Sequence, residues 1–158
     1  MGEIERLEPE RMQGLREKPS LVLVDLGSGA MPYVNPLLEV FSGVNPELRA
    51  YAIDSDGTLI KYLRALTKSE GIKNLTPKDV SIAELGDYLA KQKVISVDIL
   101  TLFNPAPHRE FPNLATIPRD MIKDAVLIGG AETGYGNING EEHYRKGLNA
   151  GGFRILFS

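Results

Sequence analysis

Residues 21–36 read LVLVDLGSGAMPYVNP, and this stretch decides the fold. The run 21–27 is apolar apart from one acid and ends in a glycine, a pattern typical of a strand buried on both faces in a parallel sheet. Gly27 and Gly29 form a turn after it, and a short helix is expected over NPLLEVF. Ligands bind at the carboxyl ends of parallel strands, and glycine lets them approach the main chain, so the turn is a candidate binding site.

The rest of the chain alternates between strand and helix patterns. Further strands are expected at 47–54, 74–82, 93–105, 125–130 and 153–158, and further helices at 1–18, 56–71, 83–92, 116–124 and 140–152. This alternation predicts an α/β fold, with a doubly wound, mostly parallel sheet of about six strands and helices on both faces. We expect a single domain over 1–158, with an N-terminal helix at 1–18 and the core at 20–158.

Composition narrows the possible functions. The 158 residues are 42% hydrophobic and 25% charged, which suits one soluble core. A net charge of −3 without a long basic block does not support a dedicated nucleic-acid binder, although it leaves open an enzyme that acts on nucleic acid. The absence of cysteine excludes disulfides and thiolate metal sites, and two histidines, His108 and His143, do not make a metal cluster. We see no signal peptide or membrane span, so a cytoplasmic location is expected.

Two acids, Asp25 and Asp54, end neighbouring predicted strands, so both carboxylates can accept hydrogen bonds from a ligand in one crevice. The simpler alternative is that the glycines only make a tight turn and that Asp54 caps the following helix. A dinucleotide site is less favoured, because its fingerprint needs a third glycine where Pro32 stands, and an acid only about 20 residues downstream.

The sequence VDLGSG, followed by the acid that closes AYAID, resembles the class I S-adenosylmethionine-dependent methyltransferases, which have a Rossmann-like fold. The likeness runs from about residue 20 to 158, in a short and divergent form. It implies that the glycine turn, Asp25, Gly27, Ser28 and Gly29, surrounds the methionine part of the cofactor, and that the acid after the second strand, Asp54 with Ser55, holds the ribose hydroxyls.

The family's third glycine is replaced here by Met31. That side chain either crowds the cofactor or points away from it, if Pro32 reroutes the turn. The family position that flanks the adenine falls on Ser81 and Ile82 in KDVSIAEL, with serine in place of the usual acid.

The fourth strand ends in LFNPAP, which resembles the Asn-Pro-Pro-aromatic motif of methyltransferases that modify amino nitrogens. Asn104 and Pro105 match, but the aromatic residue is missing, so a nucleobase amine is not supported as the acceptor. We therefore predict that Asn104 and His108 face the acceptor, with His108 as a general base or an orienting group. A solvated loop histidine is the alternative.

Two later features bear on substrate and assembly. The glycine-rich stretch 129–140 either closes over a substrate, with Glu132 and Tyr135, or simply connects two elements. The family commonly has two strands after the fifth, and this chain has one, so we expect the open edge to be hidden or to form a homodimer. Little room remains for a recognition insertion, which implies a small acceptor or one presented by a partner. A non-catalytic cofactor-binding or assembly module and an NAD-binding oxidoreductase remain alternative functions.

Overall fold

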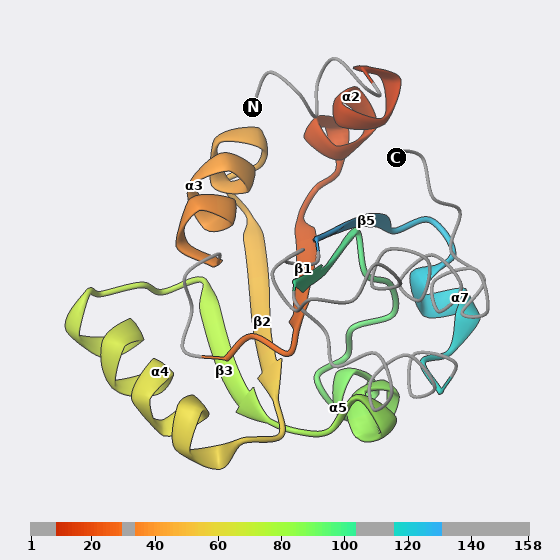
Figure 1. Ribbon diagram of the computed structural model, residues 1–158. Helices are drawn as coiled ribbons and strands as arrows, with labels where there is room; N and C mark the ends of the chain where they lie inside the picture. Colours follow the sequence, from red (N-terminus) through yellow and green to blue (C-terminus); the bar gives the residue numbers. More distant parts are fainter. Residues whose placement is uncertain (1–8, 30–33, 104–115, 131–158) are drawn as a thin grey trace, which may run out of the picture.

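The computed structural model describes residues 9–29, 34–103 and 116–130 (Figure 1). Its strands are β1 Leu21–Leu26, β2 Leu48–Asp54, β3 Leu75–Asp79, β4 Ile99–Phe103 and β5 Val126–Gly130. Its helices are α2 Pro9–Glu17, α3 Val34–Val44, α4 Gly57–Ser69, the 3-10 helix η1 Ile82–Glu84, α5 Leu85–Lys91 and α7 Arg119–Ile122.

The strands form one parallel sheet in the order β3-β2-β1-β4-β5. The chain builds outward from β1 to β3, then returns to the other side of β1 for β4 and β5, so the order reverses between β1 and β4. The predicted doubly wound α/β fold is confirmed. The strand expected at 153–158 and the helix expected at 140–152 lie outside the described residues.

β1 separates the two halves of the core. Val22, Val24 and Leu26 pack on one face of the sheet, and Leu21 and Leu23 pack on the other. The first face is covered by the side chains Leu85 and Leu89 of α5 and Met121 and Ile122 of α7, and the second by Leu38 and Phe41 of α3 and Ile60 and Leu63 of α4. Figure 1 shows α3 and α4 on one side of the sheet and α5 and α7 on the other. Both faces of β1 are therefore buried, as its apolar sequence predicts.

α4 begins and ends at local signals. The side chain of Asp56 caps its N-terminus, because Oδ1 accepts the N–H groups of Thr58 at 2.8 Å and Leu59 at 3.3 Å. Beyond its C-terminus, Gly71 has a φ of 67°, which glycine adopts without strain. The cap is thus Asp56, and the alternative that Asp54 serves only as the cap is wrong.

Three predicted elements are markedly shorter in the structure. The strand expected at 74–82 covers only Leu75–Asp79, because Ser81 caps the 3-10 helix η1 that begins at Ile82. The strand expected at 93–105 begins only at Ile99: Lys93, with a φ of 59°, belongs to the turn after α5, and residues 94–98 are not part of a strand. Val94 and Val97 are buried in the loop before the strand instead. The helix expected at 116–124 shrinks to four residues that begin after Pro118.

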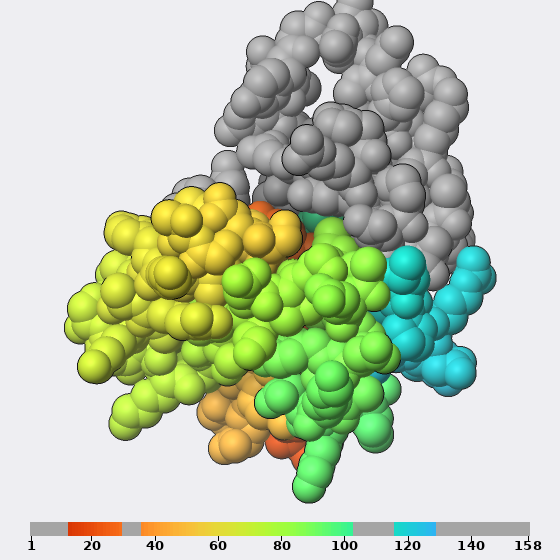
Figure 2. Space-filling model, turned by 90° about the horizontal axis from the view of Figure 1, so that it is seen from below, coloured from red at the N-terminus to blue at the C-terminus, as the bar shows by residue number. Residues whose placement is uncertain are grey.

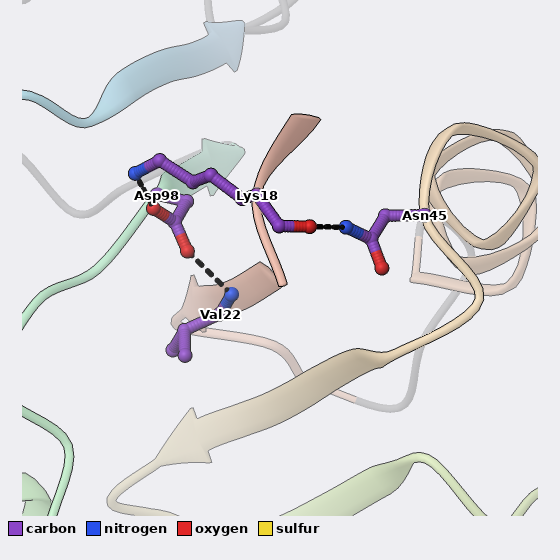
Figure 3. Close-up of polar contacts among 4 residues, drawn as sticks. All are labelled: Lys18, Val22, Asn45 and Asp98. Carbon is purple, nitrogen blue, oxygen red and sulfur yellow. Dashed lines mark hydrogen bonds and ion pairs between the residues drawn. The ribbon is translucent and has the colours of Figure 1, made fainter. Parts of the chain in front are cut away.

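The amino end of the sheet is fastened by Asp98, just before β4 (Figure 3). Its Oδ1 pairs with Lys18 Nζ, and its Oδ2 accepts the Val22 N–H at 2.7 Å. Asn45, which follows α3, donates from Nδ2 to the Lys18 carbonyl at 2.7 Å and accepts the Glu47 N–H on Oδ1 at 2.9 Å. These contacts join the residues before β1, β2 and β4, so the elements enter the sheet in a fixed register.

Among the described residues, the helices are all too short or too polar to cross a membrane. The same part of the chain holds no group of His, Asp or Glu side chains suited to a metal ion.

Candidate functional site

The glycine turn after β1 has the backbone that its sequence predicts. Gly27 and Gly29 have φ values of 65° and 54°, in the left-handed region where a Cβ is strained. Between them, Ser28 donates its N–H to the Ile53 carbonyl at 3.0 Å, so the turn folds back over the end of β2. The Ser28 hydroxyl is buried and has no hydrogen-bond partner among the described residues. An unpaired buried hydroxyl is costly and marks positions that serve another role.

Asp54, the last residue of β2, holds this turn. Its Oδ2 accepts the Gly29 N–H at 2.9 Å, and its Oδ1 accepts the Asp56 N–H at 2.8 Å. Each oxygen of a carboxylate can accept a second hydrogen bond, so both keep capacity for a ligand. Ser55 follows and is exposed. Asp54 therefore links the two loops that border the carboxyl ends of β1 and β2.

Asp25 lies deeper than the sequence predicts. It is 3% exposed, on the strand itself, and its Oδ1 accepts a hydrogen bond from Thr101 Oγ1 of β4 at 2.5 Å. Burial raises the pKa of Asp25 from its ordinary 3.8 to about 7; the Thr101 hydrogen bond opposes the rise and the charge of Asp54 adds to it. Asp25 thus lies buried two residues before the glycine turn, on the β1–β4 pair where the strand order reverses.

The two residues predicted to flank the adenine, Ser81 and Ile82, both contact other protein side chains. Ser81 Oγ donates to Glu84 Oε2 at 2.6 Å, and this hydrogen bond is the main reason that the pKa of Glu84 is lowered. Ile82 is buried in the core against α5. The assignment of Ser81 and Ile82 to the cofactor stays a prediction.

Asp79, the last residue of β3, is a further candidate that the sequence analysis missed. It stands beside Asp54 in the β2–β3 register. A Cβ on Gly57 would come within 2.8 Å of Asp79 Oδ2, so glycine at the start of α4 leaves room for this carboxylate. The sequence pattern hides this acid, because the apolar residues Val80 and Ile82 extend the expected strand past the point where β3 ends.

The candidate site is therefore formed by the carboxyl ends of neighbouring strands, at one end of the sheet. Figure 2 views the molecule from below Figure 1, with α4 in yellow and the segment after β3 in green. Other predicted residues fall outside the described part of the chain: the catalytic candidates Asn104 and His108, the turn residues Met31 and Pro32, and the loop residues Glu132 and Tyr135.

No family model and no curated protein matches the sequence. Among solved structures, a SAM-dependent methyltransferase from Aquifex aeolicus superimposes with a TM-score of 0.65 at 20% identity, over 96% of this chain and 84% of that one. The fold is that of the class I S-adenosylmethionine-dependent methyltransferases.

Two more structures of this methyltransferase fold agree. The precorrin-6y C5,15-methyltransferase of Geobacter metallireducens has a TM-score of 0.61 at 17% identity, over 93% of this chain and 71% of that one. A SAM-dependent O-methyltransferase of Thermotoga maritima has a TM-score of 0.59 at 18% identity, over 88% of this chain and 47% of that one. At such low identity the likeness concerns the methyltransferase fold, and function has to be argued from the site.

Proposed function

We propose that this protein is an S-adenosylmethionine-dependent methyltransferase acting on an acceptor that is not yet identified. The observation that carries the proposal is the pair of hydrogen bonds from Gly29 and Asp56 to the Asp54 carboxylate. They hold an acid and a glycine turn together at the carboxyl ends of β1 and β2, beside the reversal in strand order where ligands of this architecture bind.

The residues at the strand ends fit such a cofactor. Asp54 keeps lone pairs for the ribose hydroxyls, with Ser55 next to it, and Asp79 stands one strand further on. Among the described residues, no atom lies within 4 Å of a Cβ built on Gly29, and the buried Ser28 hydroxyl lacks a partner in the same part of the chain. A polar ligand in the turn supplies the missing partner.

The sulfonium of the bound cofactor supplies an activated methyl group, so the protein mainly has to align the acceptor with it. This explains why a catalytic triad or a metal cluster is not required. Asn104 and His108 remain the residues proposed to face the acceptor, which we expect to be small or to be presented by a partner.

The test is calorimetric titration with S-adenosylhomocysteine, with NADH in parallel. We expect micromolar binding of the first and none of the second. Asp54→Ala should weaken binding by about 1–3 kcal/mol, because the ribose hydroxyls lose their acceptor. Asp87→Ala, which removes an equal charge from an exposed position on α5, is the control and should leave binding unchanged.

Other outcomes select the other functions. Saturable NADH binding without S-adenosylhomocysteine binding would favour the oxidoreductase. Binding no tighter than millimolar would favour the assembly module. The proposed homodimer is tested separately by sedimentation, where a monomer at high concentration would count against it.

A further inference from the structure

Thr101 is a polar side chain in the centre of the sheet, and the function proposed above does not yet use it. It is fully buried, and it faces Asp25 across the β1–β4 pair, where the strand order reverses. The register also places Ala52 on the other side of Asp25 and Ile128 on the other side of Thr101. A hydroxyl and a carboxyl are therefore enclosed by apolar neighbours in one row of the sheet, close behind the glycine turn.

The Thr101 hydroxyl stands between two acceptors but has a single proton to donate. Oγ1 lies 2.5 Å from Asp25 Oδ1 and 3.5 Å from the Val24 carbonyl oxygen. When Asp25 is ionised, the hydroxyl donates to its carboxylate. When Asp25 carries a proton, the carboxyl donates to Thr101, and the hydroxyl is released toward Val24. Thr101 can thus partner both charge states, but it lowers the energy of the ionised one more strongly, because hydrogen bonds to charged groups are stronger.

The charges around Asp25 are few in the described part of the chain. β2 contributes Asp54, whose charge opposes ionisation of Asp25. The helices over this face carry exposed charges only: Glu39 on α3, and Lys61, Arg64 and Lys68 on α4. Burial and Asp54 raise the pKa of Asp25 to about 7 against the effect of Thr101, so the carboxyl changes charge near neutral pH.

We propose that Thr101 is a positioning residue that sets the charge of the Asp25 carboxyl, and that this charge lets the site prefer the cationic sulfonium cofactor over its neutral thioether product. The inference rests on the proposed function. An ionised carboxylate in a poorly solvated position attracts a nearby positive charge, whereas it has little effect on a neutral thioether. Preference for the cofactor therefore rises with pH as Asp25 ionises, and the product is released more readily than the cofactor.

The experiment measures dissociation constants for S-adenosylmethionine and S-adenosylhomocysteine from pH 6 to 8.5. In the unmodified protein, the ratio of the product constant to the cofactor constant should rise several-fold, with a midpoint near pH 7. Asp25→Asn has no carboxyl to ionise at this position, so its ratio reports the titration of all other groups of the protein and the ligands. Subtracting that profile isolates the contribution of Asp25.

Two variants at position 101 separate positioning from packing. Thr101→Val keeps the shape but removes the donor, and should move the midpoint upward by about one pH unit. Thr101→Ser keeps the hydroxyl and should restore the original midpoint. A role in packing alone would lower stability in these variants without moving the midpoint.

The outcomes distinguish this inference from the proposed function. If both ligands bind and the ratio follows the same pH profile in the unmodified protein and in Asp25→Asn, the inference is overturned and the methyltransferase proposal stands. If neither ligand binds the unmodified protein, the proposed function fails first and the inference falls with it.

Discussion

Two buried aspartates lie at opposite ends of the same sheet, and the protein treats them differently. Asp98, at the amino end, is 4% exposed and has the Lys18 ammonium and the Val22 N–H as partners. Asp25, at the carboxyl end, is 3% exposed and has a hydroxyl partner and the opposing charge of Asp54. Asp98 is therefore paired with a cation and a backbone donor, whereas Asp25 has only a neutral hydroxyl partner and lies near a like charge.

This difference indicates that the polar groups at the amino end stabilise the fold, whereas those at the carboxyl end are suited to binding a ligand. At the amino end the polar groups join the residues that precede three strands, and burial of the charge is offset by its ion pair. At the carboxyl end the Ser28 hydroxyl lacks a described partner, and two glycines hold positive φ values. The unpaired hydroxyl costs stability, the glycines leave the main chain open, and both features are typical of sites that bind a ligand.

Removing the compensated acid should have the largest effect. Asp98→Ala leaves the Val22 N–H buried without an acceptor and removes the partner of Lys18, so we expect a loss of about 3–4 kcal/mol in the free energy of unfolding. Urea denaturation measures it. Asp98→Asn keeps one acceptor oxygen and should lose less. A loss under about 1 kcal/mol in the alanine variant would contradict the role given to this end of the sheet.

Replacing Asp25 should change the free energy of unfolding in the opposite direction, and the size of the change should depend on pH. Because the folded pKa of Asp25 is raised to about 7, its contribution to stability is present at low pH and is lost as the pH rises from about 4 to 7. Relative to Asp25→Asn, the native protein should lose about 3 kcal/mol of unfolding free energy between pH 5 and pH 8. Parallel denaturation profiles for the two proteins would show that Asp25 does not titrate in this range.

The sequence predicts the fold well, because local patterns determine most of it. The apolar run 21–27, the acid that ends β2 and the Gly71 stop all lie where the structure has them. The strand predicted at 93–105 was extended too far toward the N-terminus. Val94 and Val97 are apolar residues that are buried in a loop. An apolar sequence pattern does not distinguish a buried loop from a strand.

The site is only partly predictable, because its main contacts join residues far apart in the chain. Asp54 and the glycines follow from local signals at strand ends. Thr101 does not, because its partner lies 76 positions away and is brought to it only by the β1–β4 register. Asp98 and Lys18 are 80 positions apart and were missed for the same reason.

The glycine turn should respond moderately to substitution. Gly29→Ala forces a Cβ into a φ of 54° and should lower the unfolding free energy by about 1–2 kcal/mol, measured by urea denaturation. Gly14→Ala is the control: that glycine lies inside α2 with no atom near the added Cβ, so it should gain up to about 1 kcal/mol. Equal effects at the two positions would remove the case for a constrained turn.

The smallest effect is expected at Ser81, the residue that precedes η1. The Ser81 hydroxyl is bound to Glu84, so Ser81→Ala should change the affinity for S-adenosylhomocysteine by less than about threefold. Asp79→Ala, on the strand beside Asp54, should weaken it more. Calorimetry on both variants decides between them, and a greater loss in Ser81→Ala would restore the sequence-based assignment.

The most direct test of the contrast between the two ends is an amide chemical-shift titration with S-adenosylhomocysteine, read by ¹H–¹⁵N NMR. We predict the largest shifts at Gly27, Ser28, Gly29 and Asp56, and little change at the amides of Val22, Asn45 and Asp98. Large shifts at the amino end, or no shifts anywhere at millimolar ligand, would contradict a cofactor site at the carboxyl end of the sheet.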